Sequence, residues 1–421
     1  MKFYKTLLFL IIILIPVFAK KIKGKKSNSI KKIKKKHLTD AILGNICMTS
    51  AQNEILAKNN INNTKYIYEN DQCPKLIVIY VSHLGYSGLG RVASMLSFIL
   101  RDLNYQVVFI MENVNLVTYN YYGLICKCNM KSKFVKNLLN EAAFIFDFHW
   151  KYSNRKYPFV KYCIDHYENK YIPTIHTETC KPYFDVIKKY LDKKPISHLY
   201  RILCVSEAVR KNFINIYGDN NNILTIHNPI DIKKIEMSLA AGTDFELEGY
   251  YLYAGRLGTP HSKGLDLLLR GFLQSKASEN NYLVIAGAGK LNNILLDELE
   301  SNPRKDRIIF LGFRSDIYAL MAKAKCLLAP SRREGFSMSH IESLACGTPV
   351  VSSRCGGAEE IIQHKKNGYL FDVEDLEGFI DAINYMDTNA KSMRNTCIKS
   401  VQKFSTEKYM KKIGKILSES N

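Results

Sequence analysis

The chain has 421 residues, of which 47% are hydrophobic and 24% charged. This is the composition of an ordinary globular protein, long enough for two α/β domains. The formal net charge is +21, but residues 1–36 hold twelve lysines and no acidic residue. The rest of the chain therefore carries only +9 (21 less 12), which argues against a nucleic-acid-binding body. The eleven cysteines show no paired framework, which favours a reducing compartment over a disulfide scaffold.

The amino-terminal segment 1–36 has the pattern of a targeting or anchoring sequence. Leu7–Phe18 is a run of twelve apolar residues, which matches a signal-peptide core and falls short of the ~20 residues that span a bilayer. The ten lysines of Lys20–Lys36 favour an anchor that keeps the body in the cytosol and contacts an anionic membrane surface. The alternative is cleavage near Ala19 and export, or a lumenal body in which Asn62 would be a glycosylation acceptor. Nuclear localisation or nucleic-acid binding is a third interpretation of such a lysine run.

After a polar, Asn-rich linker at 37–72, the sequence predicts a Rossmann-like domain over 73–229. A buried strand at Lys75–Val81 leads into a glycine turn at Ser82–Arg91 and a helix at Val92–Leu103. Gly88 in this turn is a candidate site residue. Further strands are expected at 106–111, 143–148, 171–177, 202–206 and 223–226.

Two of these strands end in histidine, at His149 and at His176. A lone histidine at a strand end is more often a satisfied polar group than a catalyst. We therefore expect His149 to be structural and keep His176 as a candidate.

A second domain is predicted over 230–400, after an Asn228-Pro229 turn at the domain boundary. Arg256 directly follows a buried strand that begins at Tyr251, and Lys263 precedes an amphipathic helix. This spacing places two cations at the carboxyl end of one strand, where they could hold a diphosphate. Further strands are expected at 282–289 and 308–313, and helices at 376–386 and 406–417.

The most informative stretch is 326–371, which reads as a strand, a loop, a helix and a strand. Glu334 lies in the loop and Glu342 lies eight residues later in the helix, so both carboxylates are predicted to face one ligand at the strand's carboxyl end. The start of this helix, Gly335–Ser337 with Phe336 between them, offers backbone N–H groups and a positive dipole end that suit a phosphate. Gly347 and Pro349 are expected to end the helix.

Together with Gly356–Ile362 and Asn367–Leu370, this block resembles the donor-binding region of glycosyltransferase family 4, the retaining GT-B enzymes. The resemblance covers roughly residues 75–420. It implies an α/β fold of GT-B architecture, in which two Rossmann-like parallel-sheet domains face each other across a cleft. It also implies that a helix in 401–421 returns to the first domain. Pro229 departs from the family, which usually has glycine at that position.

The resemblance implies a role for each candidate residue. Glu334 accepts from hydroxyls of the donor sugar, Glu342 accepts from the ribose, and Arg256 with Lys263 neutralises the leaving diphosphate. His176 holds the sugar or the acceptor, and Gly88 lies against the donor phosphate and the acceptor.

The predicted function is transfer of a hexose-type sugar from a nucleotide diphosphate sugar to a hydroxyl of a glycan or a lipid-linked acceptor, with retention. No metal or other cofactor is expected, because the sequence contains no Asp-x-Asp and no His/Cys cluster with ligand spacing. The competing interpretations are an inactive sugar-nucleotide-binding scaffold, a nucleotide-sugar epimerase and a phosphorylase on the same fold. A scaffold would need none of the four charged candidates, and no cofactor-lysine environment for a phosphorylase is evident.

Overall fold

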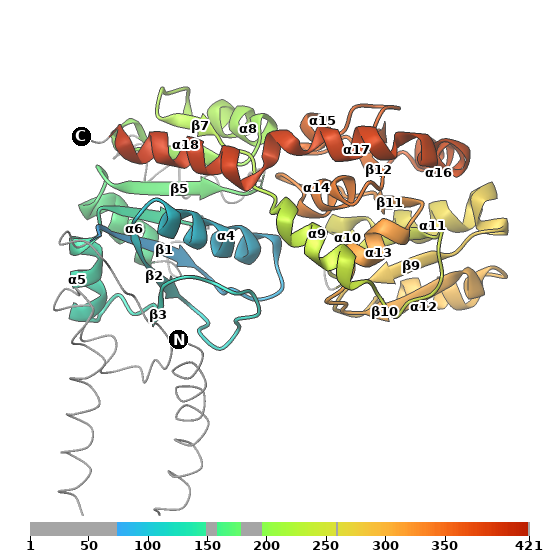
Figure 1. Ribbon diagram of the computed structural model, residues 1–421, viewed down its shortest axis with the longest axis horizontal. Helices are drawn as coiled ribbons and strands as arrows, with labels where there is room; N and C mark the ends of the chain where they lie inside the picture. Colours follow the sequence, from blue (N-terminus) through green and yellow to red (C-terminus); the bar gives the residue numbers. More distant parts are fainter. Residues whose placement is uncertain (1–73, 149–157, 178–195, 258–259, 420–421) are drawn as a thin grey trace, which may run out of the picture.

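The computed structural model describes residues 74–148, 158–177, 196–257 and 260–419. They form two α/β domains placed side by side along the long axis of the molecule (Figure 1). The first domain contains a seven-stranded sheet of order β3-β2-β1-β4-β5-β6-β7, and the second a six-stranded sheet of order β10-β9-β8-β11-β12-β13. Every strand pair in both sheets is parallel. The prediction of two Rossmann-like parallel-sheet domains is thus confirmed.

The strands and helices of the first domain have the following bounds: β1 Leu76–Val81, α4 Gly88–Asp102, β2 Gln106–Met111, β3 Leu124–Lys127, α5 Lys133–Glu141, β4 Phe144–Asp147, α6 Pro158–His166, β5 Tyr171–Ile175, β6 Ile202–Cys204, α8 Glu207–Tyr217 and β7 Ile223–Thr225.

Those of the second domain and of the carboxyl terminus are α9 Ile232–Ala241, β8 Tyr251–Ala254, α10 Pro260–Lys263, α11 Leu265–Gln274, β9 Leu283–Ala286, α12 Asn293–Glu300, β10 Ile308–Gly312, α13 Ile317–Lys323, β11 Cys326–Ala329, α14 Met338–Ala345, β12 Val350–Ser353, α15 Ala358–Ile361, β13 Gly368–Phe371, α16 Leu376–Asn389, α17 Arg394–Ser400 and α18 Thr406–Ser418.

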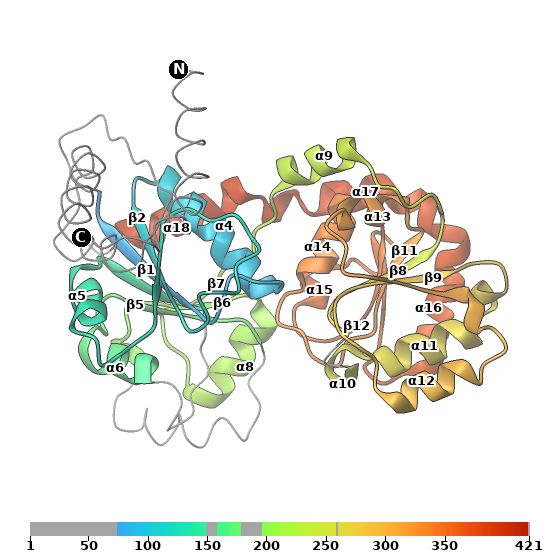
Figure 2. The ribbon, with the colours of Figure 1, turned by 90° about the horizontal axis from the view of Figure 1, so that it is seen from below.

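The central strands are continuous apolar runs because helices cover both faces of each sheet. In β1 every residue is buried, and the same holds for β9 and β11. Figure 2 shows helices on both sides of the second sheet. Such a run is typical of a parallel sheet, which buries its two faces equally.

The sequence-based prediction for the first glycine turn needs one correction. The helix predicted at Val92 begins at Gly88, one turn earlier. Ser87 is its N-cap and accepts a hydrogen bond from the Gly90 N–H at 3.0 Å, so Gly88 and Gly90 lie in the first helical turn. A Cβ at Gly90 would lie 2.9 Å from the Gly85 carbonyl oxygen, which explains why a residue with low helix propensity stands there.

The edge strand β3 was not predicted. It is four residues long and only two of them are buried, so its apolar signal is too short to distinguish it from a loop.

The chain passes between the domains at two places, and these passages touch each other. The Ile230 N–H donates to the Phe404 carbonyl at 2.8 Å, and the Thr406 N–H donates to the Ile230 carbonyl at 3.2 Å. From there α18 runs back along the first domain (Figure 1). Its residues Ile413 and Leu417 are buried in the same cluster as the inner face of α4.

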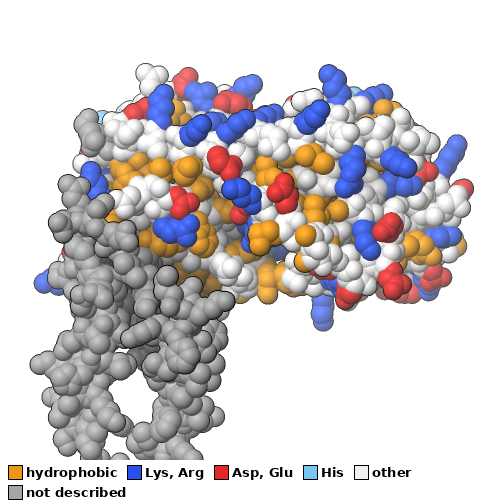
Figure 3. Space-filling view, in the orientation of Figure 1, with side chains coloured by type: hydrophobic (Ala, Val, Ile, Leu, Met, Phe, Trp, Pro, Cys, Tyr) orange, Lys and Arg blue, Asp and Glu red, His pale blue; other side chains and the backbone are white. Residues whose placement is uncertain are grey.

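Charges of both signs are interspersed over both domains on the face seen in Figure 3. Within the described ranges, no helix combines the length and the apolar character needed to cross a membrane. Three features of the sequence lie outside these ranges: the lysine-rich segment 1–36, the possible glycosylation acceptor Asn62, and His149.

Candidate active site

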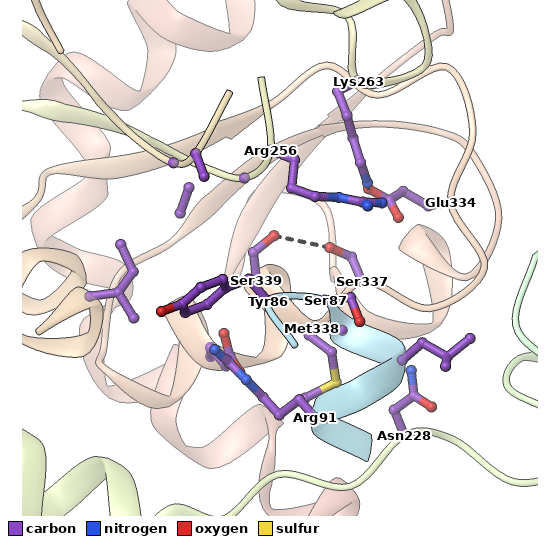
Figure 4. A pocket seen from close by; sticks show the side chains of 18 of the residues that line it. Tyr86, Ser87, Arg91, Asn228, Arg256, Lys263, Glu334, Ser337, Met338 and Ser339 are labelled. Atoms are coloured by element: carbon purple, nitrogen blue, oxygen red, sulfur yellow. Dashed lines mark hydrogen bonds and ion pairs between the residues drawn. The ribbon is translucent and has the colours of Figure 1, made fainter. Parts of the chain in front are cut away.

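A cavity of ≈ 440 Å³ lies between the two domains, at the carboxyl ends of their strands. Its walls come from the loops after β1, β5, β8, β9 and β11 and from the first turns of α4 and α14 (Figure 4). All nine candidate residues from the sequence line it: Gly88, His176, Arg256, Lys263, Glu334, Gly335, Phe336, Ser337 and Glu342. This is the location that open α/β sheets generally use for ligands.

The loop that carries Glu334 is fixed by two glycines in close contact with neighbouring backbone. A Cβ at Gly335 would lie 2.0 Å from the carbonyl oxygen of His176, in the opposite domain. A Cβ at Gly356, which has φ of +53°, would lie 1.9 Å from the carbonyl oxygen of Glu334. Glycine is therefore required at Gly335 for the loop to approach the first domain this closely, and at Gly356 for the backbone of the second domain to pack against the loop.

Glu334 and Lys263 form an ion pair at the second-domain wall of the cavity. The Lys263 Nζ lies 2.5 Å from Oε1 of Glu334, and the Ser331 hydroxyl donates to the same oxygen at 3.1 Å. Burial acts to raise the pKa of Glu334, but the charge and hydrogen bond of Lys263 outweigh it and hold the pKa below its usual value. Figure 4 shows Arg256 extending toward this pair. The sequence predicted both residues for the site but not that they would bind each other.

His340 lies behind this ion pair and was not singled out from the sequence. Its side chain is fully buried, and neither ring nitrogen has a hydrogen-bond partner among the described residues. Burial lowers its pKa to about 4, with Glu334 acting to raise it and Lys263 acting to lower it further. The imidazole is therefore neutral at physiological pH. Nothing in its spacing distinguished it from a helix core residue.

Glu342 is held by the first domain. Its side chain is 5% exposed, and Oε1 forms an ion pair with Nη1 of Arg91, a residue of α4. The Tyr318 hydroxyl also approaches Oε1, at 3.4 Å. Arg91 follows the glycine turn but was not predicted as a site residue, because its partner lies 251 positions away.

His176 lines the cavity from the end of β5. Its Nε2 lies 3.0 Å from the Thr174 hydroxyl, and its ring stacks obliquely on Phe148, with centroids 5.1 Å apart. Burial lowers its pKa to about 4. The ring is thus neutral and its orientation is fixed on two sides, as a group that contacts a bound ligand requires.

The start of α14 faces the cavity. Ser337 is the N-cap of this helix, and its hydroxyl lies 3.1 Å from that of Ser339 (Figure 4). Asn228, at the end of the first domain, donates to the Phe336 carbonyl at 3.1 Å. The helix begins next to two cations, so its dipole adds to a positive local field.

A second contact between the domains lies beside the chain crossings. Glu360 of α15 accepts hydrogen bonds from the backbone N–H groups of Glu207 and Ala208, at 3.0 and 3.1 Å. It thereby caps α8 of the first domain. His227 Nε2 lies 2.7 Å from the same carboxylate. Burial acts to raise the pKa of Glu360, but these hydrogen bonds outweigh it and lower the pKa.

Over the ranges that the structure describes, no group of three or more histidine, cysteine, aspartate or glutamate side chains is placed to hold a metal ion. The charged side chains that line the cavity are four cations and two carboxylates: Arg91, Arg256, Lys263, Arg314, Glu334 and Glu342. The formal charge of this group is +2 (four less two), which suits an anionic ligand that also carries hydroxyls.

Comparison with known sequences gives a partial match. Residues 248–389 match the family model of glycosyl transferases group 1. An uncharacterized glycosyltransferase of Methanocaldococcus jannaschii is 30% identical over 181 residues, which are 40% of this chain and 46% of that protein. Lipopolysaccharide 1,6-galactosyltransferase of Escherichia coli is 25% identical over 225 residues, 51% of this chain and 60% of that protein. The chain thus spans about half the length of these curated relatives.

Solved structures match over more of the chain. Anabaena HepE in complex with UDP has a TM-score of 0.64 at 17% identity, covering 82% of this chain and 100% of that one. Sucrose-phosphate synthase from Thermosynechococcus elongatus has a TM-score of 0.64 at 15% identity, covering 82% and 98%. These likenesses show the predicted GT-B fold. The match over residues 248–389 makes the second domain of this chain similar to glycosyl transferases group 1.

Proposed function

We propose that the chain is a retaining glycosyltransferase that moves a hexose-type sugar from a nucleotide diphosphate sugar to an acceptor hydroxyl without a metal ion. The observation that carries the proposal is the convergence of two carboxylates, four cations and a helix N-terminus in one cavity between the domains. Cations and a helix N-terminus recognise a diphosphate, while carboxylates accept from sugar hydroxyls. A nucleotide diphosphate sugar presents both kinds of group in one molecule.

The proposed roles are those that the family resemblance implies, and the positions of the residues in the cavity support them. Arg256 and Lys263 stabilise the charge that develops on the diphosphate as its bond to the sugar breaks. Glu334 accepts from hydroxyls of the donor sugar, and Glu342 from those of the ribose. When the diphosphate binds, Lys263 contacts both it and Glu334, so the ion pair aligns the carboxylate with the leaving group. His176, neutral and fixed by Thr174, holds the sugar or the incoming acceptor.

Turnover by the full-length chain tests the proposal. UDP-, GDP- and ADP-sugars are screened for hydrolysis and transfer in the presence of EDTA, with the parent, Glu334→Ala and the matched control Glu298→Ala. Glu298 lies on α12 with its side chain 42% exposed and pairs with Arg270 away from the cavity. Removing a contact made in the transition state costs about 10²–10³ in rate, so Glu334→Ala should lose that factor and Glu298→Ala none.

Two results would contradict the proposal. Activity of Glu334→Ala within tenfold of the parent removes Glu334 from the reaction. A folded parent that binds a donor and turns over none of the sugars favours the sugar-nucleotide-binding scaffold, whereas conversion of the donor to its epimer favours the epimerase.

For the acceptor, we propose a glycan or a lipid-linked sugar at a membrane. Relatives of this chain include a lipopolysaccharide galactosyltransferase and a UDP-Gal:alpha-D-GlcNAc-diphosphoundecaprenol alpha-1,3-galactosyltransferase, both of Escherichia coli.

For the location of the protein, we propose that the apolar run and the lysines of residues 1–36 anchor the body to the cytosolic side of a membrane. Synthesis of the full-length chain in the presence of endoplasmic-reticulum microsomes tests on which side of the membrane the body lies. Glycosylation of Asn62 would place the body in the lumen and overturn the cytosolic assignment.

A further inference from the structure

Arg91 reaches from the first domain into the part of the cavity formed by the second. It lies in the first turn of α4, directly after the glycine turn, and its Nη1 binds Oε1 of Glu342 in α14. The guanidinium lies 5.2 Å from the ring centroid of Tyr119, and its Nη1 lies 3.3 Å from the Tyr318 hydroxyl. Side chains from both domains therefore hold the arginine in one position.

The carboxylate of Glu342 is only half engaged by these contacts. Both recorded partners, Arg91 and Tyr318, bind Oε1. Among the residues that the structure describes, no hydrogen bond to Oε2 is recorded. Glu342 nevertheless lines the cavity, so Oε2 is the oxygen available to a ligand hydroxyl.

The ion pair is also shielded from water. The side chains of Arg91 and Glu342 are 24% and 5% exposed. A buried carboxylate that loses its cation is strongly disfavoured, and its orientation is then no longer determined. The guanidinium therefore fixes the plane in which the second oxygen of the Glu342 carboxylate points.

We propose that Arg91 is a positioning residue for the nucleotide: it orients Glu342 to accept from the ribose hydroxyls, so that the first domain takes part in recognising the donor's ribose. This inference rests on the proposed function, because it requires a nucleoside diphosphate in the cavity. Helix α4 would then affect donor binding in two ways: Gly88 lines the cavity directly, and Arg91 acts indirectly by orienting Glu342.

An opposite role for Arg91 is a latch that the ribose must displace from Glu342. The two roles predict opposite signs for the same substitution. If Arg91 positions Glu342, removing its charge weakens nucleotide binding. If Arg91 competes with the ribose, removing it strengthens binding.

The experiment is calorimetric titration of the full-length chain with UDP, GDP and ADP, followed by the 2′,3′-dideoxy form of whichever binds most tightly. The variants are Arg91→Met, which keeps the apolar stem without the charge, and Arg91→Lys, which keeps the charge. The matched control is Arg101→Met on the same helix, because Arg101 is 47% exposed, pairs with Asp102 and does not line the cavity.

For Arg91→Met we expect affinity for the ribonucleotide to fall by about tenfold or more, the usual loss for a hydrogen bond to a charged group. Affinity for the dideoxy nucleotide should change by less than about threefold, since it lacks the hydroxyls that Glu342 accepts from. Arg91→Lys should recover part of the loss, and Arg101→Met should match the parent. Comparing the two nucleotides on one protein sample separates this effect from incomplete folding.

Three outcomes would overturn the inference. Tighter binding of the ribonucleotide by Arg91→Met would establish the latch. An equal loss for both nucleotides would show a purely structural role in domain packing, and unchanged binding would show no role. All three leave the proposed function standing, whereas a folded parent that binds none of the three nucleotides would overturn both.

Discussion

Replacing Gly335 by alanine should open the cleft without disturbing either domain core. The added Cβ would lie 2.0 Å from the His176 carbonyl oxygen, and real Cβ atoms essentially never come within 3.0 Å of another heavy atom. The domains must therefore separate by at least 1.0 Å here (3.0 less 2.0). The loop cannot retreat on its own side, because the Gly335 carbonyl accepts from the Gly357 N–H at 2.8 Å. A misplacement of about 1 Å at a reacting centre costs on the order of 10² in rate.

The assay compares kcat/KM for the donor with thermal unfolding, for the parent, Gly335→Ala and Gly414→Ala. In Gly414→Ala the new Cβ would meet only Leu103, at 3.5 Å, in the interior of α18. This control should keep full activity and gain up to about 1 kcal/mol in stability, as alanine does in a helix. Gly335→Ala should lose about 10² in kcat/KM with a nearly unchanged unfolding midpoint. Activity within threefold of the parent would show that the approach of Gly335 to His176 does not position the reacting groups.

Three further variants test the electrostatics and the domain contacts. Burial lowers the pKa of His340 and of His176 to about 4, so below pH 6.5 the unfolded chain binds protons that the folded chain does not. The stability contributed by each histidine is then greatest above pH 6.5 and falls as the pH drops toward 4, by about 1 kcal/mol per histidine between pH 7.0 and 5.5. The free energy of unfolding, measured by urea titration at these two pH values, checks this prediction. His340→Leu should remove half of the pH-dependent loss. An unchanged pH dependence in this variant would refute the lowered pKa of His340. Ile413→Ala in α18 should lower the free energy of unfolding by about 2–5 kcal/mol, because the side chain is fully buried, and a loss below 1 kcal/mol by urea titration would show that α18 is loosely held. Glu360→Ala should cost about 1 kcal/mol through the lost cap of α8 and increase the radius of gyration in solution scattering, whereas a parent-like scattering profile would show that the cap does not hold the domains together.

The sequence predicted the second-domain wall of the cavity well because its determinants are local. The loop at Glu334, the helix that follows and the glycine that ends it lie within one strand–loop–helix unit. Gly347 has φ of +82° and follows Cys346, the C-cap of α14, as the pattern of apolar residues and glycine indicated. The two cations after β8 were found in the same way, from their position after a buried strand.

The contacts that complete the cavity could not be predicted in this way. Arg91 and Glu342 are 251 residues apart, and their meeting depends on how one domain is placed against the other. Glu360 likewise caps a helix that begins more than 150 residues earlier. His340 was missed for a different reason: its helical spacing is that of a core residue, and only its burial without a partner distinguishes it.

The paired chain crossings determine how the two domains can move. Ile230 and the residues around Ser405 are joined by backbone hydrogen bonds, so both covalent connections lie at one edge of the interface and act as a single rotation axis. Strands β12 and β13 form one end of the second sheet and β10 the opposite edge. Phe313 directly follows β10, and its ring lies 4.2 Å from the ring of Tyr86 in the first domain, measured between centroids. Because displacement increases with distance from an axis, we expect a rotation of the domains to separate these two rings more than groups beside the crossings. Such a rotation would therefore open the cavity first on the side of these two aromatic rings.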